Sequence, residues 1–520
     1  MEIDVPTIDS SIPSGKAYVI GTGEAYGELG LGDDMTSVSR LTLIEALKDE
    51  DIVDVQSSYM HSLALTKNGK IWSWGGNEFG ALGREGIESI PQPISHMSIK
   101  YTKFSKIACG YTYSMAISSK GQLYTWGTFM SNQGVFGYFP GTDIQRYPRI
   151  VGALAHETCV DIAVGKHHCI CLTSDGSVYS WGCGEYWQLG RKVSEKHMLS
   201  ESLIPQRLNL KDIINIACGA FHSLALDHQG QLYTWGQNNY GQCGVSRRIA
   251  KNKVIDASNL ILEPTLVPYF DEINKEQQQH YYQSKDLPEL YGSHHHKNVS
   301  SHEIKEESED EEDDNVSVVI HNSRTSNTGA SSRGTKRGKE QSRKENNQAY
   351  SKFRKKNNEE RSNSSQHKGV FEPYDIKHIV SIAAGDHSST VLMSDNTFVV
   401  FGRCEEGQLG IPLYPGFIYP GSKVNMTSKR VYAIGYPIAS LWAPTEKIIN
   451  LTCGCNSSLV MTESGKLFFW GIPFFTQTSE NGHEIISSQH LPALLKDVVE
   501  ENMNIIAMSI GDNYGVLVIE

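Results

Sequence analysis

The stretch IVDVQSSYMHSLALTKNGKIWSWGGNEFGALG, residues 52–83, decides the fold of this chain. An apolar run is followed by a second apolar run, a Lys-Asn-Gly-Lys turn and an aromatic run that ends in Trp-Gly. Period-two alternation on both sides of Asn-Gly predicts a β-hairpin, because that dipeptide tolerates the positive φ of a type I′ turn. The final Gly-Ala-Leu-Gly predicts a further turn that closes the unit.

The same pattern recurs along the chain, each time with an aromatic or apolar residue directly before a glycine. The pairs are Ile20-Gly21, Trp74-Gly75, Trp126-Gly127, Trp181-Gly182, Trp235-Gly236, Phe401-Gly402 and Trp470-Gly471. The first four intervals between these glycines are 54, 52, 55 and 54 residues. A period of this size, with several strands in each unit, is typical of a β-propeller. Such a fold does not lead us to expect a deep enzymatic cleft.

The two ends of the chain are complementary parts of one unit. Residues 16–32 supply only its later strands, and residues 505–520 supply only its earlier ones. Paired together, they would close the ring and remove its exposed sheet edges. Six complete units and this shared one predict an all-β, seven-bladed β-propeller closed by its N- and C-terminal strands.

One interval, between Gly236 and Gly402, is 166 residues long. Its middle part is rich in Ser, Asn, Glu and Lys and poor in apolar residues, so it cannot bury enough surface to offset chain entropy. We predict a disordered, charged insertion over residues 272–372. The propeller then occupies residues 16–271 and 373–520.

Composition narrows the function classes. The net charge is −12, so the whole chain is not a polycation that coats nucleic acid. The acidic tail, residues 1–15, lacks the pattern of a secretory signal, and no apolar run is long enough to span a membrane. Cys109, Cys218 and Cys453 alternate with valine and alanine at one repeat position. They are therefore expected to be small buried groups in a reducing, intracellular compartment, nuclear or cytoplasmic.

The repeat, Gly-x-x-His-Ser followed by Trp-Gly-x-Asn-x-x-Gly-Gln-Leu-Gly, resembles that of the regulator of chromosome condensation family. The resemblance covers nearly the whole chain outside the insertion. Residues 75–84, 126–137 and 182–191 bring it closest to the family's guanine-nucleotide exchange factor for the small GTPase Ran. The resemblance implies accelerated nucleotide release without covalent chemistry or a cofactor. It also implies a nuclear, chromatin-associated protein of nucleocytoplasmic transport and mitosis.

By this resemblance, the third unit carries a β-wedge, a hairpin that presses on the GTPase near its nucleotide. Its residues are Phe129, Met130, Ser131, Asn132, Gln133, Gly134, Val135 and Phe136. Asn132 and Gln133, followed by Gly134, suit a projecting tip, and Val135 and Phe136 are expected to anchor the base. Without the resemblance, an irregular blade end is the simpler interpretation.

The resemblance also implies a GTPase-binding face. Its residues are Arg191, His387, His61 and Glu24. His61 shares its repeat position with His168 and His222, which favours hydrogen bonding between neighbouring blades. For Arg191, a guanidinium that forks to a carboxylate competes with a solvated surface arginine.

Several positions depart from the exchange factor. Tyr111 and His167 stand where it carries acidic residues, and Asn513 where it carries histidine. Lys192, Lys196 and His197 replace arginines that dock on the nucleosome. These departures keep open a propeller adaptor, or a chromatin-binding scaffold, without exchange activity.

The insertion contains a basic block that resembles nuclear import signals and would also bind phosphates. Its residues are Lys336, Arg337, Arg343, Lys344, Arg354, Lys355 and Lys356. Expected partners are therefore Ran, an import receptor and chromatin, as nucleosome or DNA, with no membrane. The alternative is a solvated tail whose charges keep it soluble. The chain lacks a phosphate-binding loop, Gly-x-Ser-x-Gly and His-Glu-x-x-His, so no enzyme or metal site is expected.

Overall fold

The computed structural model describes most of the chain outside the insertion. The described residues are 2–9, 11–23, 26–194, 198–250, 253–255, 258–273, 275, 377–413, 418–425, 427–428, 430–440, 442–473, 477–478, 484–485, 488–495 and 503–520. They belong to one compact unit, Met1–Lys285 with Ile376–Glu520. The second unit, Asp286–Asp375, lies outside the described residues, so the boundaries proposed for the insertion stay a prediction.

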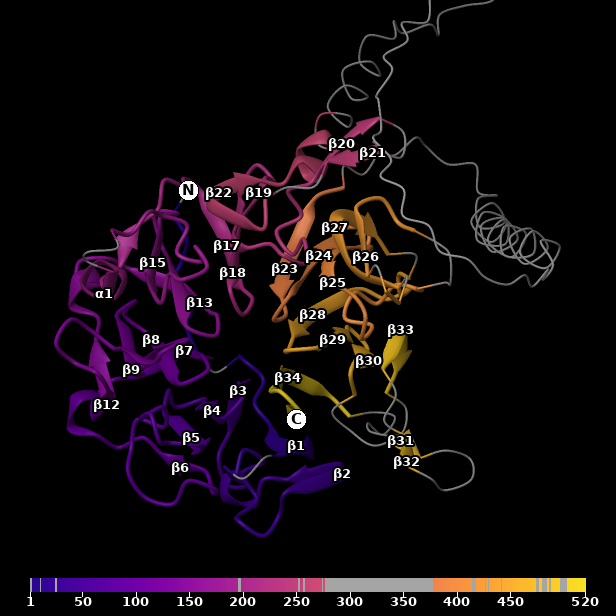
Figure 1. Cartoon of the computed structure of the whole chain (residues 1–520). Coiled ribbons are helices and arrows are strands. Elements are labelled where there is room, and N and C mark those ends of the chain that lie inside the picture. The colour runs from indigo at the N-terminus through magenta and orange to yellow at the C-terminus, as the bar shows by residue number, and fades with distance from the viewer. Residues whose placement is uncertain are drawn as a thin grey trace, which may run out of the picture. The chain divides into compact units, whose positions relative to one another are not determined.

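Seven antiparallel sheets form the blades of a propeller (Figure 1), which confirms the predicted fold class. Blade 1 contains β34 (Ile505–Ile510), β35 (Tyr514–Ile519), β1 (Lys16–Thr22) and β2 (Ser37–Leu43). Blade 2 contains β3 (Ile52–Ser57), β4 (His61–Thr66), β5 (Ile71–Gly75) and β6 (Gln92–Pro93). Blade 3 contains β7 (Phe104–Cys109), β8 (Tyr113–Ser118), β9 (Leu123–Gly127) and β12 (Gln145–Ile150).

The remaining blades repeat this order. Blade 4 contains β13 (Cys159–Val164), β14 (His168–Thr173), β15 (Val178–Gly182) and β16 (Gln206–Arg207). Blade 5 contains β17 (Ile213–Cys218), β18 (His222–Asp227), β19 (Leu232–Gln237) and β22 (Leu260–Leu266). Blade 6 contains β23 (Ile379–Ala384), β24 (Ser388–Met393), β25 (Phe398–Arg403), β27 (Val431–Ala439) and β26 (Ser422–Val424). Blade 7 contains β28 (Ile448–Cys453), β29 (Ser457–Thr462), β30 (Leu467–Gly471) and β33 (Gln489–Leu494).

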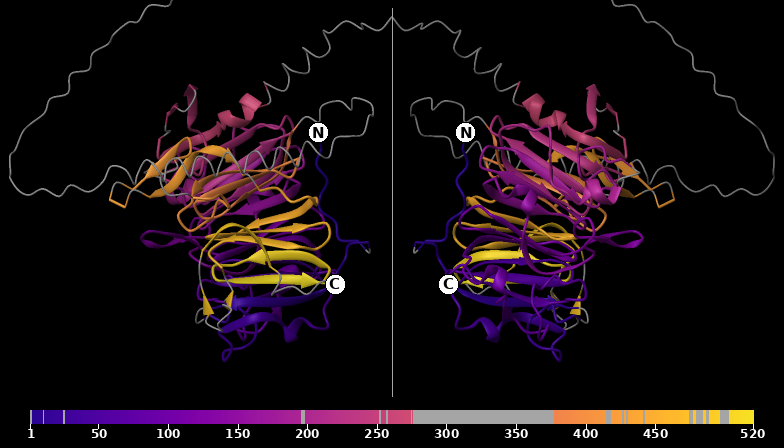
Figure 2. Two further views of the ribbon diagram at one scale, coloured as in Figure 1. Left: turned by 90° about the vertical axis from the view of Figure 1, so that its right-hand side faces the viewer. Right: turned by 90° about the vertical axis from the view of Figure 1, so that its left-hand side faces the viewer.

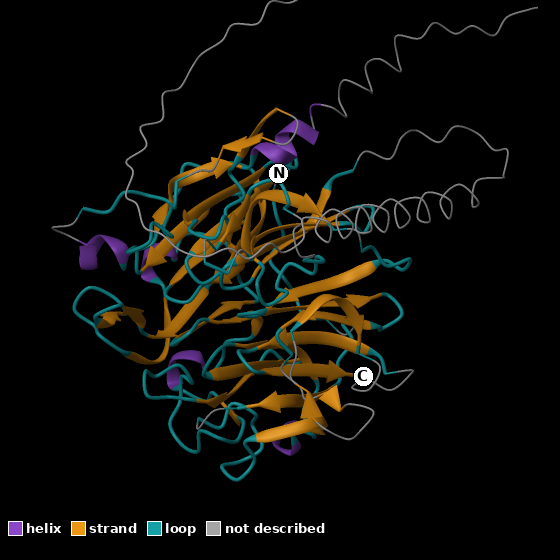
Figure 3. Cartoon of the chain, turned by 45° about the vertical axis from the view of Figure 1, so that its right-hand side comes forward, coloured by secondary structure: helices purple, strands orange, loops and turns teal. Residues whose placement is uncertain are grey.

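Smaller elements decorate the blades. Three two-stranded hairpins are β10 (Phe129–Ser131) with β11 (Gly134–Gly137), β20 (Arg247–Ala250) with β21 (Lys253–Ile255), and β31 (Gln477–Thr478) with β32 (Glu484–Ile485). The labelled short helices are η1 (Glu45–Leu47), η2 (Met97–Ile99), η3 (Gly152–Leu154) and α1 (Met198–Ser202), and residues 268–273 are helical as well. Strands and loops dominate the described part of the chain (Figure 3).

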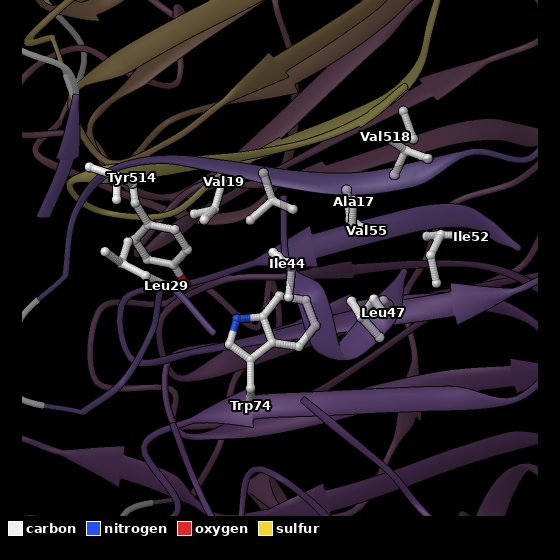
Figure 4. Close-up of a cluster of buried hydrophobic side chains, with 14 residues drawn as sticks. Ala17, Val19, Leu29, Ile44, Leu47, Ile52, Val55, Trp74, Tyr514 and Val518 are labelled. Atoms are coloured by element: carbon white, nitrogen blue, oxygen red, sulfur yellow. The ribbon is translucent and has the colours of Figure 1, made fainter. Parts of the chain in front are cut away.

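Both ends of the chain meet in blade 1, as the sequence predicts. β1 pairs antiparallel with β35, from Lys16 opposite Ile519 to Gly21 opposite Tyr514. The inward side chains of this pair join a buried cluster with Trp74 of blade 2 (Figure 4). The closing contact is therefore part of the hydrophobic core and not only a backbone ladder.

The Gly-x-Leu-Gly turn, or its equivalent, connects blades 1, 2, 4 and 6 each to the next blade. In blade 2, the Ala81 carbonyl accepts a hydrogen bond of 2.7 Å from Nε1 of Trp126, one blade on. Gly83 has a φ of +67°, and a Cβ there would lie 2.8 Å from the same Nε1. Equivalent bonds join Trp74 to Glu28 and Trp235 to Gln188. The turn caps the neighbouring tryptophan, which explains why glycine and tryptophan recur together.

The histidines of the repeat also join neighbouring blades. The Nε2 atoms of His61, His168 and His222 lie 2.7, 2.8 and 2.9 Å from serine hydroxyls of the next blade. All three side chains have no exposed surface. This confirms the structural role predicted for them. It also corrects the placement of His61 on the GTPase-binding face, because a fully buried ring cannot contact a docked protein.

These buried histidines predict acid sensitivity. Burial disfavours their charged form and lowers the pKa of His61, His168 and His222 to about 3. Below pH 6.5 the unfolded chain therefore binds more protons than the folded one. The free energy of unfolding consequently decreases as the pH is lowered. Burial raises the pKa of Asp54 and Asp386 to about 6, which acts in the opposite direction for only two groups.

We expect the unfolding free energy to fall by at least about 1.4 kcal/mol per pH unit, the contribution of one such group, between pH 6 and 4. Thermal unfolding at stepped pH measures this change. His222→Gln should make the dependence shallower by about one proton. A midpoint that stays constant or rises on acidification would contradict the argument.

Candidate functional site

The loops between the two inner strands of every blade surround the mouth of a central channel. A cavity of about 210 Å³ lies there, lined by three successive residues from most blades. The third lining residue of each blade is Tyr59, Tyr111, Lys166, Ala220, Asp386, Cys455 or Asp512. The ten cysteines are free thiols. For Cys109, Cys218 and Cys453, this agrees with the expectation from their exchange with valine and alanine.

The hairpin β10–β11 occupies residues 129–137, where the resemblance places the wedge. Ser131 pairs with Gly134, so Asn132 and Gln133 form an exposed tip. Figure 2 shows the hairpin, in the purple of residues near 130, projecting from the face opposite the N and C labels. The hairpin therefore projects from the propeller, as expected for a wedge. Its contact with a GTPase stays a prediction.

The base of the hairpin differs from the sequence-based expectation. Val135 is 46% exposed and does not anchor it. Phe129 is buried instead, with its ring centroid 4.5 Å from that of Tyr113, and Phe136 packs against the same cluster. Alternation along a strand sends adjacent side chains to opposite faces, so Val135 and Phe136 cannot both point inward. The ring of Phe129 also lies next to Gly182 of blade 4, where a Cβ would be 3.1 Å from its Cε1. At the equivalent Gly236 of blade 5, this place is taken by Gln188 of the preceding turn.

The tip of the hairpin is held by the loop after β15. The Asn132 backbone N–H donates to Oε2 of Glu185 at 3.2 Å, and its Nδ2 donates to the Tyr186 hydroxyl at 2.9 Å. The ring of Tyr186 lies 4.7 Å from that of Phe221 in blade 5. The tip is thus fixed relative to the channel mouth by side chains of the next two blades.

Arg191 points into its own blade. Its Nη2 donates to the carbonyl oxygens of Ser180, Glu201 and Ile204, at 3.4, 3.0 and 3.4 Å. Burial lowers the pKa of this guanidinium to about 10. Arg84 makes the equivalent contact with Ser73 in blade 2. The guanidinium of Arg191 therefore binds backbone carbonyls of this chain, and not an external carboxylate as the sequence suggested. Any contact of Arg191 with a GTPase stays a prediction.

His387 lies at the channel mouth within a series of rings that the sequence analysis did not identify. We call this series the aromatic arc, and its members are Tyr59, Tyr111, His167, Phe221, His387 and Tyr240. Successive centroids are 4.9, 5.5, 6.1, 6.5 and 4.9 Å apart. Five of the six occupy the loop before β4, β8, β14, β18 or β24. Their shared position in the repeat is the feature of the sequence from which their proximity could have been predicted.

Other expected site residues lie outside the described residues. They are Glu24, Lys196, His197 and the basic residues Lys336, Arg337, Arg343, Lys344, Arg354, Lys355 and Lys356. Among the residues that the structure describes, no group of three or more His, Cys, Asp or Glu is placed to hold a metal. No helix in the same ranges is long and apolar enough to cross a membrane.

Comparison with known proteins supports the fold and the family. The family model described as "RCC1-like domain" matches residues 16–300. Protein pim1 of Schizosaccharomyces pombe is 33% identical over 277 residues, which are 50% of this chain and 49% of pim1. Guanine nucleotide exchange factor SRM1 of Saccharomyces cerevisiae is 32% identical over 269 residues, covering 45% of this chain and 55% of SRM1. The chain thus spans about half the length of these curated relatives.

The human protein named Regulator of chromosome condensation is 31% identical over 253 residues, covering 45% of this chain and 58% of that protein. Among solved structures, Prp20p of Saccharomyces cerevisiae superposes with a TM-score of 0.69. The match has 24% identity and covers 98% of this chain and 92% of Prp20p. At that identity, the likeness concerns the fold.

Proposed function

The chain belongs to the RCC1-like domain family, and on that premise we propose that it is a guanine-nucleotide exchange factor for the small GTPase Ran. The observation that carries the proposal is the hairpin β10–β11. It replaces the turn that caps the neighbouring tryptophan in other blades, and its tip is exposed beside the channel mouth. The name of SRM1 as an exchange factor supports the same activity.

The proposed mechanism is differential binding. The propeller binds the nucleotide-free GTPase more tightly than the GDP-loaded form, because the hairpin and the nucleotide compete for one region of the GTPase. Linkage then requires that the exchange factor weakens GDP binding by the same factor. No bond is made or broken, and the nucleotide and its magnesium ion belong to the GTPase. The exchange factor itself needs no cofactor.

Release of a fluorescent GDP analogue from Ran tests the proposal. The purified chain should accelerate release at concentrations far below that of the GTPase, because each molecule acts repeatedly. Unchanged release over a wide range of concentrations would favour the rival function, a propeller adaptor without exchange activity. That rival is motivated by Tyr111 and His167, which stand where the exchange factor resembled by the sequence carries acidic residues.

We further propose that the protein is nuclear and associates with chromatin through the basic block of the insertion. The structure of Prp20p is described together with its binding to Gsp1p and histones, and another structure contains Kap60 bound to yeast RCC1. Both matches have 24% identity, so they motivate the proposal only by analogy.

Deletion of residues 286–372 should leave the rate of GDP release unchanged and reduce nuclear accumulation or chromatin retention. The physical reason is that the basic residues bind phosphates or an import receptor, while the propeller contains the hairpin. Fractionation of cells and the release assay measure the two effects separately. Loss of release with retained localisation would instead indicate that the insertion serves the exchange reaction.

A further inference from the structure

The rings of the aromatic arc come from five blades and form one continuous series of contacts. Burial lowers the pKa of His167 to about 3 and that of His387 to about 4, so both imidazoles are neutral at physiological pH. Phe221, His387 and Tyr240 are half-buried, so part of each ring faces solvent. The arc is therefore an uncharged aromatic surface beside the hairpin.

Two rings of the arc, Tyr111 and Tyr240, already hold a cation of this chain. The Nζ atom of Lys166 lies 4.6 Å from the centroid of Tyr111, and the guanidinium of Arg403 lies 5.6 Å from that of Tyr240. These distances are those of cation–π contacts. Phe221 lies between these two rings in the arc, and no cation from the described part of the chain lies over its own ring.

The charge of the channel mouth also suits a cation. The charged residues that line the cavity are Lys166, Asp386 and Asp512. At the far end of the arc, Arg403 is paired with Glu405. Two lining carboxylates against one lining ammonium leave a negative excess at the channel mouth, which is also lined by Ala220, the neighbour of Phe221 in the sequence.

We propose that the arc, centred on Phe221, receives a lysine or arginine side chain of the partner GTPase by cation–π contact. The inference rests on the proposed function and names the chemistry of the group that docks beside the hairpin. Tyr186 joins the two parts, because its ring lies against Phe221 and its hydroxyl accepts from Asn132 at the tip. Docking of the cation would therefore place the GTPase in register with the hairpin.

Phe221→Leu tests the proposal, because leucine keeps an apolar side chain but lacks the π face. We expect binding to nucleotide-free Ran to weaken about tenfold, and GDP release at a limiting concentration of the exchange factor to slow by the same factor. Phe221→Tyr should retain affinity. Tyr101→Leu is the matched control, since Tyr101 is 89% exposed and lies under its own Lys100, 5.5 Å from the ring centroid. This control should change neither quantity.

The outcomes separate the two proposals. An active wild-type protein with an unaffected Phe221→Leu variant would overturn the cation contact and indicate an apolar partner group. A wild-type protein that neither binds Ran nor releases GDP would overturn the proposed function, and the inference with it. If Phe221→Leu lowers the thermal midpoint, Phe221→Met provides a second apolar side chain that fits irregular gaps. Tenfold weaker binding at an unchanged midpoint supports the proposal.

Discussion

Replacement of residues 130–135 by an Asn-Gly turn is expected to slow GDP release from Ran about 100-fold, the upper range of a coupling between two ligands. The variant keeps Phe129 and Phe136, which pack in the core, and removes the exposed tip at Asn132 and Gln133. The propeller should therefore fold with an unchanged thermal midpoint. Stopped-flow release of a fluorescent GDP analogue gives the rate.

A milder change tests whether the hairpin must be held in place. Tyr186→Phe removes the hydroxyl that accepts from Asn132 and keeps the ring against Phe221. Loss of one hydrogen bond predicts release about threefold slower. Tyr147→Phe is the control, because it removes an exposed hydroxyl that bonds Glu85 on another part of the propeller. If the variant with the shortened hairpin accelerates GDP release from Ran as much as the wild-type protein, the hairpin is not required for nucleotide release.

Val516→Asp is expected to destabilise the propeller by about 4 kcal/mol, because it buries an unpaired carboxylate in the closing sheet. Val516 lies in β35 between β1 and β34, has no exposed surface and belongs to the cluster around Trp74. Chemical denaturation measures the loss. Limited proteolysis should also show early cleavage in β1 or β35, since both strands depend on this contact.

Leu491→Asp makes a comparable apolar-to-acid change on an outer strand, β33. Leu491 is 44% exposed, so the new carboxylate stays hydrated and the cost should be within about 0.5 kcal/mol. If both substitutions lower the free energy of unfolding equally, the closing sheet of blade 1 stabilises the propeller no more than an exposed outer strand does. A stable Val516→Asp protein would contradict the role assigned to the paired termini.

Much of the architecture could be predicted from the sequence because the repeat is local. The Asn-Gly hairpin, the Trp-Gly strand ends and the complementary termini each depend on neighbouring residues, and a regular period multiplies a weak signal. The shared position of His61, His168 and His222 likewise indicated contacts between blades. Their burial and serine partners confirm that interpretation.

The channel mouth could not be predicted in the same way. Successive rings of the aromatic arc are about 50 residues apart or more, and each comes from a different loop, so their proximity depends on the closed ring. The direction of Arg191 depends on carbonyls of its own blade that no motif reveals. Val135 was assigned to the base from its apolar character, although strand alternation places it outside.

The affinity of the chain for nucleotide-free Ran, compared with its affinity for GDP-loaded Ran, tests the central claim most directly. A device that expels the nucleotide by competing with it must bind the empty form more tightly. We predict a difference of about 100-fold by calorimetry or surface binding, and its collapse when the hairpin is shortened. Equal affinities for the two forms would contradict the exchange mechanism, however tightly the chain binds.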